Sequence, residues 1–166
     1  MPILLERRSC SLATDFVTLI AQRCHEHAEN SAVIASDGCL TYRELASRVA
    51  GLSRRLSQSG VKPESLVGIC MSRGADELTA MLAVLTLGAA YVPLDPAQPM
   101  ARLEMILADS APSAIVTKRN GPSFREDHSF TRVVIDNGAE RFDMPARGAW
   151  EPLADPDALA YVLFTS

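Results

Sequence analysis

The first helix of the chain is predicted from the spacing of its apolar residues. Phe16, Leu19, Ile20 and Cys24 recur at intervals of three and four, with polar residues between them. This is the period of an α-helix with one apolar face, so the spacing predicts an amphipathic helix over residues 14–27. The residues before it show no such period, and we expect residues 1–11 to form an N-terminal tail.

A short hairpin is predicted after this helix. Residues 32–35 form a small apolar run, and residues 39–41 form a second one. Asp37 and Gly38 lie between the two runs, and Asp-Gly is a strong signal for a tight turn because both positions tolerate positive φ angles. The second run should therefore return antiparallel to the first.

The next helix carries start and stop signals of its own. Thr41 and Glu44 have the T-x-x-E spacing of a capping box, in which each side chain bonds an amide at the start of a helix. Gly60 supplies the left-handed residue that commonly ends a helix. The apolar face between these signals is formed by Leu45, Val49, Leu52 and Leu56.

The later strands are apolar on both faces, which is typical of central parallel strands covered by helices on both sides. A buried helix is predicted over residues 75–87, and another with Leu103, Ile106 and Leu107 facing inward. Polar segments over residues 118–129 and 137–157 should lie at the surface. The predicted strands are 66–70, 89–92, 114–117, 132–135 and 159–164. The fold class is therefore α/β, with a mostly parallel sheet flanked by helices and the hairpin outside it.

Composition and charge narrow the function classes. The chain has 166 residues, 48% of them hydrophobic and 22% charged, with a net charge of −4, as in an ordinary globular domain. No stripe of Lys and Arg alternates with aromatic residues, so nucleic acid is not an expected partner. The uncharged segment from Leu78 to Leu94 is shorter than the ~20 residues of a membrane span and contains Gly88 and Pro93, so no membrane association is expected.

The cysteines predict neither a disulfide framework nor a metal site. None of Cys10, Cys24, Cys39 and Cys70 forms a C-x-x-C pair, and we expect free, buried thiols in the reducing cytoplasm. The nearest approach to a metal cluster is Cys24-His25-Glu26-His27. On a helix only Cys24 and His27 of these share a face, so no metal ligands are assigned.

Candidate catalytic residues are few. The sequence has no G-x-G-x-x-G, G-x-x-x-x-G-K-[ST], H-E-x-x-H or G-x-S-x-G motif. Asp76 and Glu77 follow Gly74 at a helix start, where the helix dipole stabilises carboxylates, and a structural role is favoured. Asp95 follows a predicted parallel strand, at the edge where α/β sheets bind ligands, but a turn-forming role before Pro96 is favoured. No catalytic residue is assigned.

Three segments resemble the first core motifs of the adenylate-forming, AMP-binding enzymes. Residues 40–45 (LTYREL) resemble the first motif, L-[TS]-Y-x-E-L, and residues 85–96 (LTLGAAYVPLDP) resemble the second, L-K-A-G-x-A-Y-V-P-L-D-P. Residues 159–166 (LAYVLFTS) resemble the opening of the third, the glycine-rich ATP phosphate loop. Thr86 stands where the family usually has Lys. The A-Y-V-P-L-D-P stretch is similar to the amino-acid-activating branch found in nonribosomal peptide synthetases.

The resemblance implies a set of motif residues. In the first two motifs the implied role is structural, and these residues are Leu40, Thr41, Tyr42, Glu44, Leu45, Gly88, Ala90, Tyr91, Val92, Pro93, Leu94, Asp95 and Pro96. Thr165 and Ser166 are implied to begin the phosphate loop. The glycines and the Lys of that loop are not among the 166 residues, so residues 12–166 are expected to form a partial adenylation domain.

The resemblance also implies a reaction. The family joins an amino-acid carboxylate to the α-phosphate of ATP with Mg²⁺ present, forming aminoacyl-AMP, and then passes the aminoacyl group to the phosphopantetheine thiol of a carrier protein. The isolated chain is expected to be inactive, to bind ATP poorly and to self-associate through exposed apolar strands. Two alternatives stay open: a non-catalytic α/β interaction or small-ligand-binding module that reuses the half-fold, and a fragment of a related acyl-CoA ligase.

Overall fold

The computed structural model describes residues 12–125, 129–135 and 158–164, and alternates helices with strands along the chain. The helices are α1 (Leu12–Glu26), α2 (Tyr42–Gln58), α3 (Ala75–Thr86) and α4 (Met100–Ser110). The strands are β1 (Ser31–Ala35), β2 (Gly38–Thr41), β3 (Leu66–Cys70), β4 (Ala90–Leu94), β5 (Ala114–Lys118) and β6 (Thr131–Ile135). Each helix and each of these strands corresponds to an element predicted from the sequence, and where the prediction gave bounds the ends agree to within two residues.

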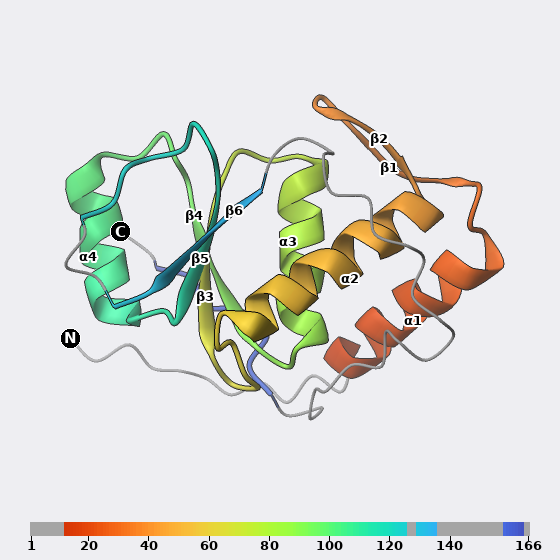
Figure 1. Cartoon of the computed structure of the whole chain (residues 1–166), viewed down its shortest axis with the longest axis horizontal. Helices are drawn as coiled ribbons and strands as arrows, with labels where there is room; N and C mark the ends of the chain where they lie inside the picture. The colour runs from red at the N-terminus through yellow and green to blue at the C-terminus, as the bar shows by residue number, and fades with distance from the viewer. Residues whose placement is uncertain (1–11, 126–128, 136–157, 165–166) are drawn as a thin grey trace.

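The main sheet is parallel throughout its four named strands, in the order β4-β3-β5-β6. Strand β3 lies at its centre, with Gly68 opposite Val92 of β4 on one side and Ile115 of β5 on the other. The chain crosses from β3 to β4 through α3 and from β4 to β5 through α4. The expected parallel α/β architecture is confirmed (Figure 1).

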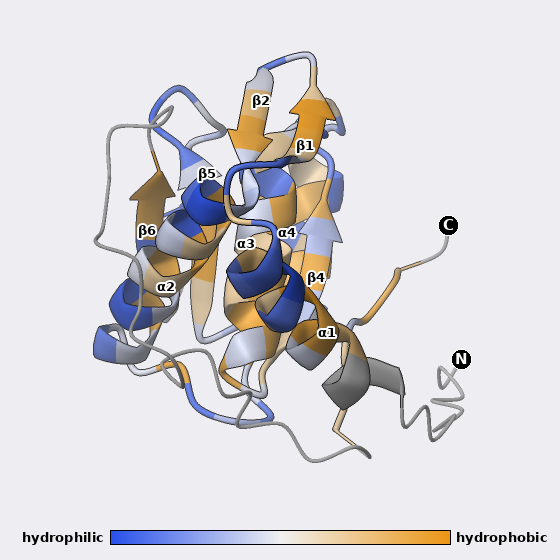
Figure 2. Ribbon diagram, turned by 90° about the vertical axis from the view of Figure 1, so that its right-hand side faces the viewer, coloured by the Kyte–Doolittle hydropathy of each residue, from blue (hydrophilic) through white to orange (hydrophobic). Residues whose placement is uncertain are grey.

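Two apolar clusters cover the two faces of this sheet. The larger packs α2 and α3 against alternate residues of the strands, such as Val67, Ile69 and Val116. The smaller packs α4 against the intervening residues, such as Val92 and Ile115. The side chains of successive strand residues point to opposite faces, so strands that are apolar throughout supply both clusters. Helices α2 and α3 lie together on one side of the sheet and α4 on the other (Figures 1 and 2).

Strands β1 and β2 form a separate antiparallel hairpin outside the main sheet, as expected. Its turn contains Asp37 and Gly38, and Gly38 has a φ of 142°, which favours glycine. Ile34 of β1 is 81% exposed, so the outer face of the hairpin carries an uncovered apolar side chain. The tip of the hairpin lies near the start of α3, where Asp37 contacts Ala75.

Two sequence-based expectations are corrected. The fifth predicted strand, residues 159–164, makes a single parallel bridge between Tyr161 and Tyr91 of β4 instead of a continuous strand. Apolar spacing reports burial, and Val162 and Phe164 do pack against the smaller cluster, but it does not report how many backbone hydrogen bonds a segment makes. Cys39 was expected to be buried, but it lies on the exposed side of the hairpin.

The lengths and hydropathy of the helices bear on membrane crossing. Within the described ranges, no helix has both the length and the hydropathy needed to span a bilayer. The uncharged segment from Leu78 to Leu94 is divided between α3 and β4, with Gly88 at a φ of 66° between them. A positive φ at this position ends the helix and turns the chain into the strand.

Candidate functional site

The first of the three sequence motifs lies at the junction of the hairpin and α2. Thr41 caps α2: its side-chain oxygen accepts a hydrogen bond from the amide of Glu44 at 3.2 Å, and Glu44 Oε2 accepts one from the amide of Thr41 at 2.9 Å. The predicted capping box is confirmed. Leu40 and Leu45 on either side are buried in the larger cluster, and Tyr42 packs against it. This motif fixes where α2 begins and has no free reactive group.

The second motif forms β4 and the turn that follows it. Ala90, Val92 and Leu94 are buried, whereas Tyr91 and Pro93 are half-buried on the opposite face. The carboxylate of Asp95 accepts a hydrogen bond from the amide of Ala97 at 2.9 Å, which is the geometry of an Asx turn. The turn-forming role favoured for Asp95 is confirmed. Pro96 follows directly and lies half-buried within this turn.

Residues 158–164 run beside β4 in the same direction. The amide of Tyr91 donates to the carbonyl of Ala160 at 3.1 Å, and the amide of Val162 donates to the carbonyl of Tyr91 at 2.9 Å. Because the two segments are parallel, Phe164 reaches the same edge of the sheet as Leu94, the edge at which α/β sheets bind ligands. Thr165 and Ser166, the expected start of the phosphate loop, lie outside the described residues.

The aromatic rings of this pair also meet. Tyr91 and Tyr161 stack with ring centroids 5.7 Å apart and an interplanar angle of 29°. Burial raises the pKa of Tyr91, and the nearby Tyr161 and Glu77 raise it further. Burial likewise raises the pKa of Glu77, while the positive charge of Arg73 lowers it. The surroundings of Tyr91 and Glu77 are thus partly desolvated, and a negative charge on either side chain is disfavoured there.

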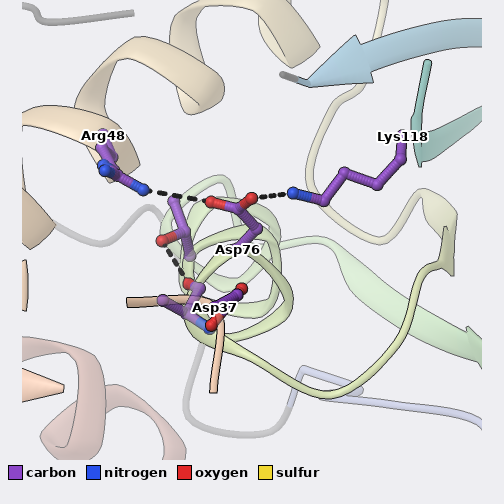
Figure 3. A network of polar contacts seen from close by, with 6 residues as sticks. Asp37, Arg48, Asp76 and Lys118 are labelled. Carbon is purple, nitrogen blue, oxygen red and sulfur yellow. Dashed lines mark hydrogen bonds and ion pairs between the residues drawn. The ribbon is translucent and has the colours of Figure 1, made fainter. Parts of the chain in front are cut away.

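A buried carboxylate lies at the same edge of the sheet, two strands away from residues 158–164. Asp76, in the first turn of α3, pairs with Arg48 of α2 at 3.1 Å and with Lys118 at the end of β5 (Figure 3). Asp76 is 7% exposed, and both cations are largely covered as well. The helix start had been expected to stabilise Asp76 and Glu77 through its dipole. The structure adds two cations for Asp76, which join α2, α3 and β5.

Sequence reasoning missed the role of Asp37. Its Oδ1 accepts a hydrogen bond from the amide of Ala75 at 3.0 Å, so a hairpin side chain caps α3, whose own N-cap residue is Gly74 (Figure 3). A Cβ atom on Gly74 would lie 2.4 Å from Asp37 Oδ2, so only glycine leaves room for this contact. A helix that starts at a glycine, without a capping side chain of its own, was the available signal. The sequence could not show which distant residue would supply the cap.

The Cys-His-Glu-His run of residues 24–27 lies at the end of α1 and just beyond it. Cys24 is buried, whereas His25 and His27 are exposed, so the Cys-His-Glu-His run does not converge. Within residues 12–125, 129–135 and 158–164, no group of three or more His, Cys, Asp or Glu side chains could hold a metal ion. Two carboxylates at this sheet edge make structural contacts: that of Asp95 forms the Asx turn, and that of Asp76 pairs with Arg48 and Lys118.

Comparison with known proteins identifies the family. The family model described as "AMP-binding enzyme" matches residues 20–166. The chain belongs to the AMP-binding enzyme family. Phosphinothricin tripeptide synthetase PhsC of Streptomyces viridochromogenes is 39% identical over 151 residues, covering 89% of this chain and 14% of that protein. The nonribosomal peptide synthetase fmqA of Aspergillus fumigatus is 37% identical over 150 residues, covering 89% of this chain and 4% of that protein. The AMP-binding segment therefore spans a small part of these relatives.

Solved structures of peptide synthetases share this fold. The synthetase FmoA3 with α-methyl-L-serine-AMP bound superposes with a TM-score of 0.76 at 25% identity, covering 96% of this chain and 18% of that one. A four-domain nonribosomal peptide synthetase bound to AMP and glycine gives a TM-score of 0.72 at 30% identity, covering 90% and 11%. The expected adenylate-forming fold is confirmed. The present chain corresponds to a part of that fold, and this part contains the parallel sheet β4-β3-β5-β6.

Proposed function

We propose that residues 12–166 are the N-terminal part of a domain that activates an amino acid with ATP. The observation that carries this proposal is the similarity to peptide synthetases, at 37–39% identity over 89% of the chain. Two solved relatives hold an aminoacyl adenylate or AMP with glycine, which are the product and components of such a reaction. In this domain the amino-acid carboxylate attacks the α-phosphate of ATP, and pyrophosphate leaves.

The proposed partners follow from the same relatives. The phosphopantetheine thiol of a carrier protein, losing its proton, then attacks the carbonyl carbon of the adenylate; a thioester forms and AMP leaves, which makes the activated residue available for peptide synthesis. Mg²⁺ accompanies ATP in this proposal and neutralises part of the phosphate charge. The described residues contribute the scaffold: the capped helix α2, strand β4 with its Asx turn, and the segment that leads toward Thr165 and Ser166.

A chimeric domain tests the proposal directly. Residues 20–166 replace the aligned segment in the adenylation domain of phosphinothricin tripeptide synthetase PhsC, and amino-acid-dependent exchange of pyrophosphate into ATP is measured. The parent domain serves as the control. We expect the chimera to retain exchange because the segment supplies the same scaffold. A chimera that purifies as a folded monomer but shows no exchange would contradict the proposal.

The same assay separates the amino-acid branch from the acyl-CoA ligase branch. The A-Y-V-P-L-D-P stretch and the relatives above favour amino acids. Exchange should therefore depend on the cognate amino acid of the parent domain. Exchange that responds to a fatty acid instead, with acyl-CoA formed on addition of CoA, would favour the ligase alternative.

A further inference from the structure

A tight turn follows strand β5. Lys118 is the last residue of this strand, and its carbonyl accepts a hydrogen bond from the amide of Gly121 at 3.0 Å. A hydrogen bond between the first and fourth residues is typical of a β-turn, which here covers residues 118–121. Asn120, the third residue of the turn, is exposed. The turn therefore presents an Asn-Gly pair to solvent.

The packing at the end of β5 requires glycine directly after Asn120. A Cβ atom on Gly121 would lie 2.3 Å from Thr117 Oγ1 and 3.0 Å from the carbonyl oxygen of Lys118. Thr117 is fully buried, so its side chain has little room to move away. A residue with a side chain at position 121 would therefore displace the turn, whereas glycine allows this close approach.

An exposed asparagine followed by glycine can react with its own backbone, because no Cβ atom hinders the next amide nitrogen. The deprotonated amide nitrogen of Gly121 attacks Cγ of Asn120 and forms a new N–C bond. The bond from Cγ to the side-chain nitrogen breaks, and ammonia leaves. Water then opens the succinimide ring at either of its two C–N bonds. One opening gives aspartate, and the other gives isoaspartate, in which the main chain runs through Cγ.

We propose that Asn120 is a site of spontaneous deamidation in the folded chain, and that the product loosens the turn after β5. The reaction consumes only water, and the ring can close once the hydrogen bond from Gly121 to Lys118 opens. Isoaspartate adds a main-chain carbon atom before Gly121. This lengthening moves Gly121 from its place beside Thr117, where the space is already filled.

Deamidation also changes the charge close to an ion pair. The neutral amide of Asn120 becomes a carboxylate, so the net charge of −4 becomes more negative by one unit. The new charge lies two residues from Lys118 in the sequence, and the ammonium group of Lys118 pairs with the buried Asp76. The modification thus acts on the end of β5 through the length of the main chain and through charge.

Asn30 provides a control within the same chain. It is also exposed, but the next residue is Ser31, the first residue of β1. The Cβ atom of Ser31 hinders ring closure, and pairing with Thr41 in the hairpin holds its backbone. Asn137 also precedes a glycine, but it lies outside the described residues and is followed as a separate peptide.

Peptide mapping of the 166-residue chain tests the site. The folded chain is incubated at pH 7, 8 and 9 and digested with trypsin, which separates residues 120–125 from residues 133–141. The peptide 120–125 should gain the mass difference between NH and O and elute as two products, while Asn30 stays intact. Conversion should speed up about tenfold per pH unit, because the deprotonated amide of Gly121 is the nucleophile. No conversion of Asn120 in the folded chain, or equal conversion of Asn30, would overturn the proposal.

Urea unfolding before and after the same incubation tests the effect on the turn. The unmodified chain should shift to a lower unfolding midpoint, whereas Asn120→Gln should keep its midpoint, because closure of a six-membered ring is slow. Asn137 is present in both chains, so a difference between them belongs to residue 120. Asn120→Asp adds the charge without lengthening the main chain and should unfold close to the fresh chain. An equal shift in Asn120→Gln, or no shift in the unmodified chain, would overturn the effect on the turn.

Discussion

Asp37 connects two parts of the fold that are distant in sequence. Its carboxylate caps α3 from the turn of the β1–β2 hairpin, since Gly74 has no side chain to do so. The amides at a helix start have no partner within the helix, and a side-chain oxygen that accepts from them stabilises the fold. The hairpin is thereby fixed against the start of α3, at the carboxyl end of β3.

Removing this cap should lower stability by a measurable amount. Asp37→Ala is expected to decrease the free energy of unfolding in urea by about 1 kcal/mol, the usual effect of losing a capping side chain. Asp37→Asn keeps an oxygen acceptor and the turn preference, and should retain most of the stability. If Asp37→Ala unfolds at the same urea concentration as the unmodified chain, the cap does not contribute to stability.

The thiols differ in reactivity because their surroundings differ. Burial raises the pKa of Cys24 and that of Cys70 to about 11, and for Cys70 the negative charge of Asp95 adds to the rise while Arg132 lowers it. Cys39 is exposed on the hairpin. The thiolate is the reactive form, so a higher pKa leaves less of it at a given pH.

Alkylation at pH 8 should therefore modify Cys39 before Cys24 and Cys70. A thiol with a pKa of about 11 is roughly 0.1% ionised at this pH, so Cys24 and Cys70 should react far more slowly. Their rates should rise about tenfold per pH unit until the pKa is approached, and urea should abolish the difference. Peptide mass spectrometry after iodoacetamide treatment measures each site. Equal labelling of Cys24, Cys39 and Cys70 in the folded chain would contradict the structure.

At the level of elements, hydrophobic spacing was sufficient to locate the helices and the four strands of the main sheet. Runs apolar on both faces predicted the parallel strands because burial on both sides leaves no alternation. Residues 159–164 have the same apolar character but form one bridge to β4, since spacing reports burial and does not report how far backbone pairing extends. The capping box was predictable because both partners lie within four residues. The contacts of Asp37 and Asp76 were not, because they depend on tertiary structure.

Asp76 joins three elements and should be sensitive to loss of its charge. Asp76→Asn leaves Arg48 and Lys118 near each other without a counter-charge in a largely covered place. We expect the free energy of unfolding to fall by about 1–3 kcal/mol, a range that allows for the remaining solvent access of the two cations.

A carboxylate on the surface provides the control for this change. Asp109→Asn alters the exposed side of α4 and should change stability by less than about 0.5 kcal/mol. Both variants can be compared by urea unfolding monitored by circular dichroism. Similar stabilities for Asp76→Asn and Asp109→Asn would show that the three-element ion pair makes no net contribution.

At the level of the whole molecule, the distribution of exposed apolar residues matters most. Leu159, Tyr161 and Leu163 are 40%, 50% and 58% exposed along one face of the segment beside β4. The outer edge of this segment has no strand beside it among the described residues. Apolar strands with open edges pair with other chains. The polypeptide of 166 residues is therefore expected to self-associate.

Sedimentation velocity over a range of concentrations measures this association. The combined change Leu159→Ser and Leu163→Ser should shift the population toward monomer because it removes apolar surface from that face. Met105→Ser is the matched control, since Met105 is 54% exposed on α4 and is not part of this segment. A monomer at every concentration for the unmodified chain would contradict the expectation. Equal shifts in the control and the double variant would place the contact elsewhere.

The central claim is that this chain is the scaffold portion of an amino-acid-activating domain, and a single exchange assay tests it. The 166-residue chain and the chimera with the synthetase PhsC are compared for amino-acid-dependent exchange of pyrophosphate into ATP. By the motif resemblance, Thr165 and Ser166 begin the phosphate loop, and the glycines and Lys that would stabilise charge on the phosphates are not among the 166 residues. We predict exchange by the chimera and none by the isolated chain. A folded chimera without exchange, or exchange by the chain alone, would contradict this assignment.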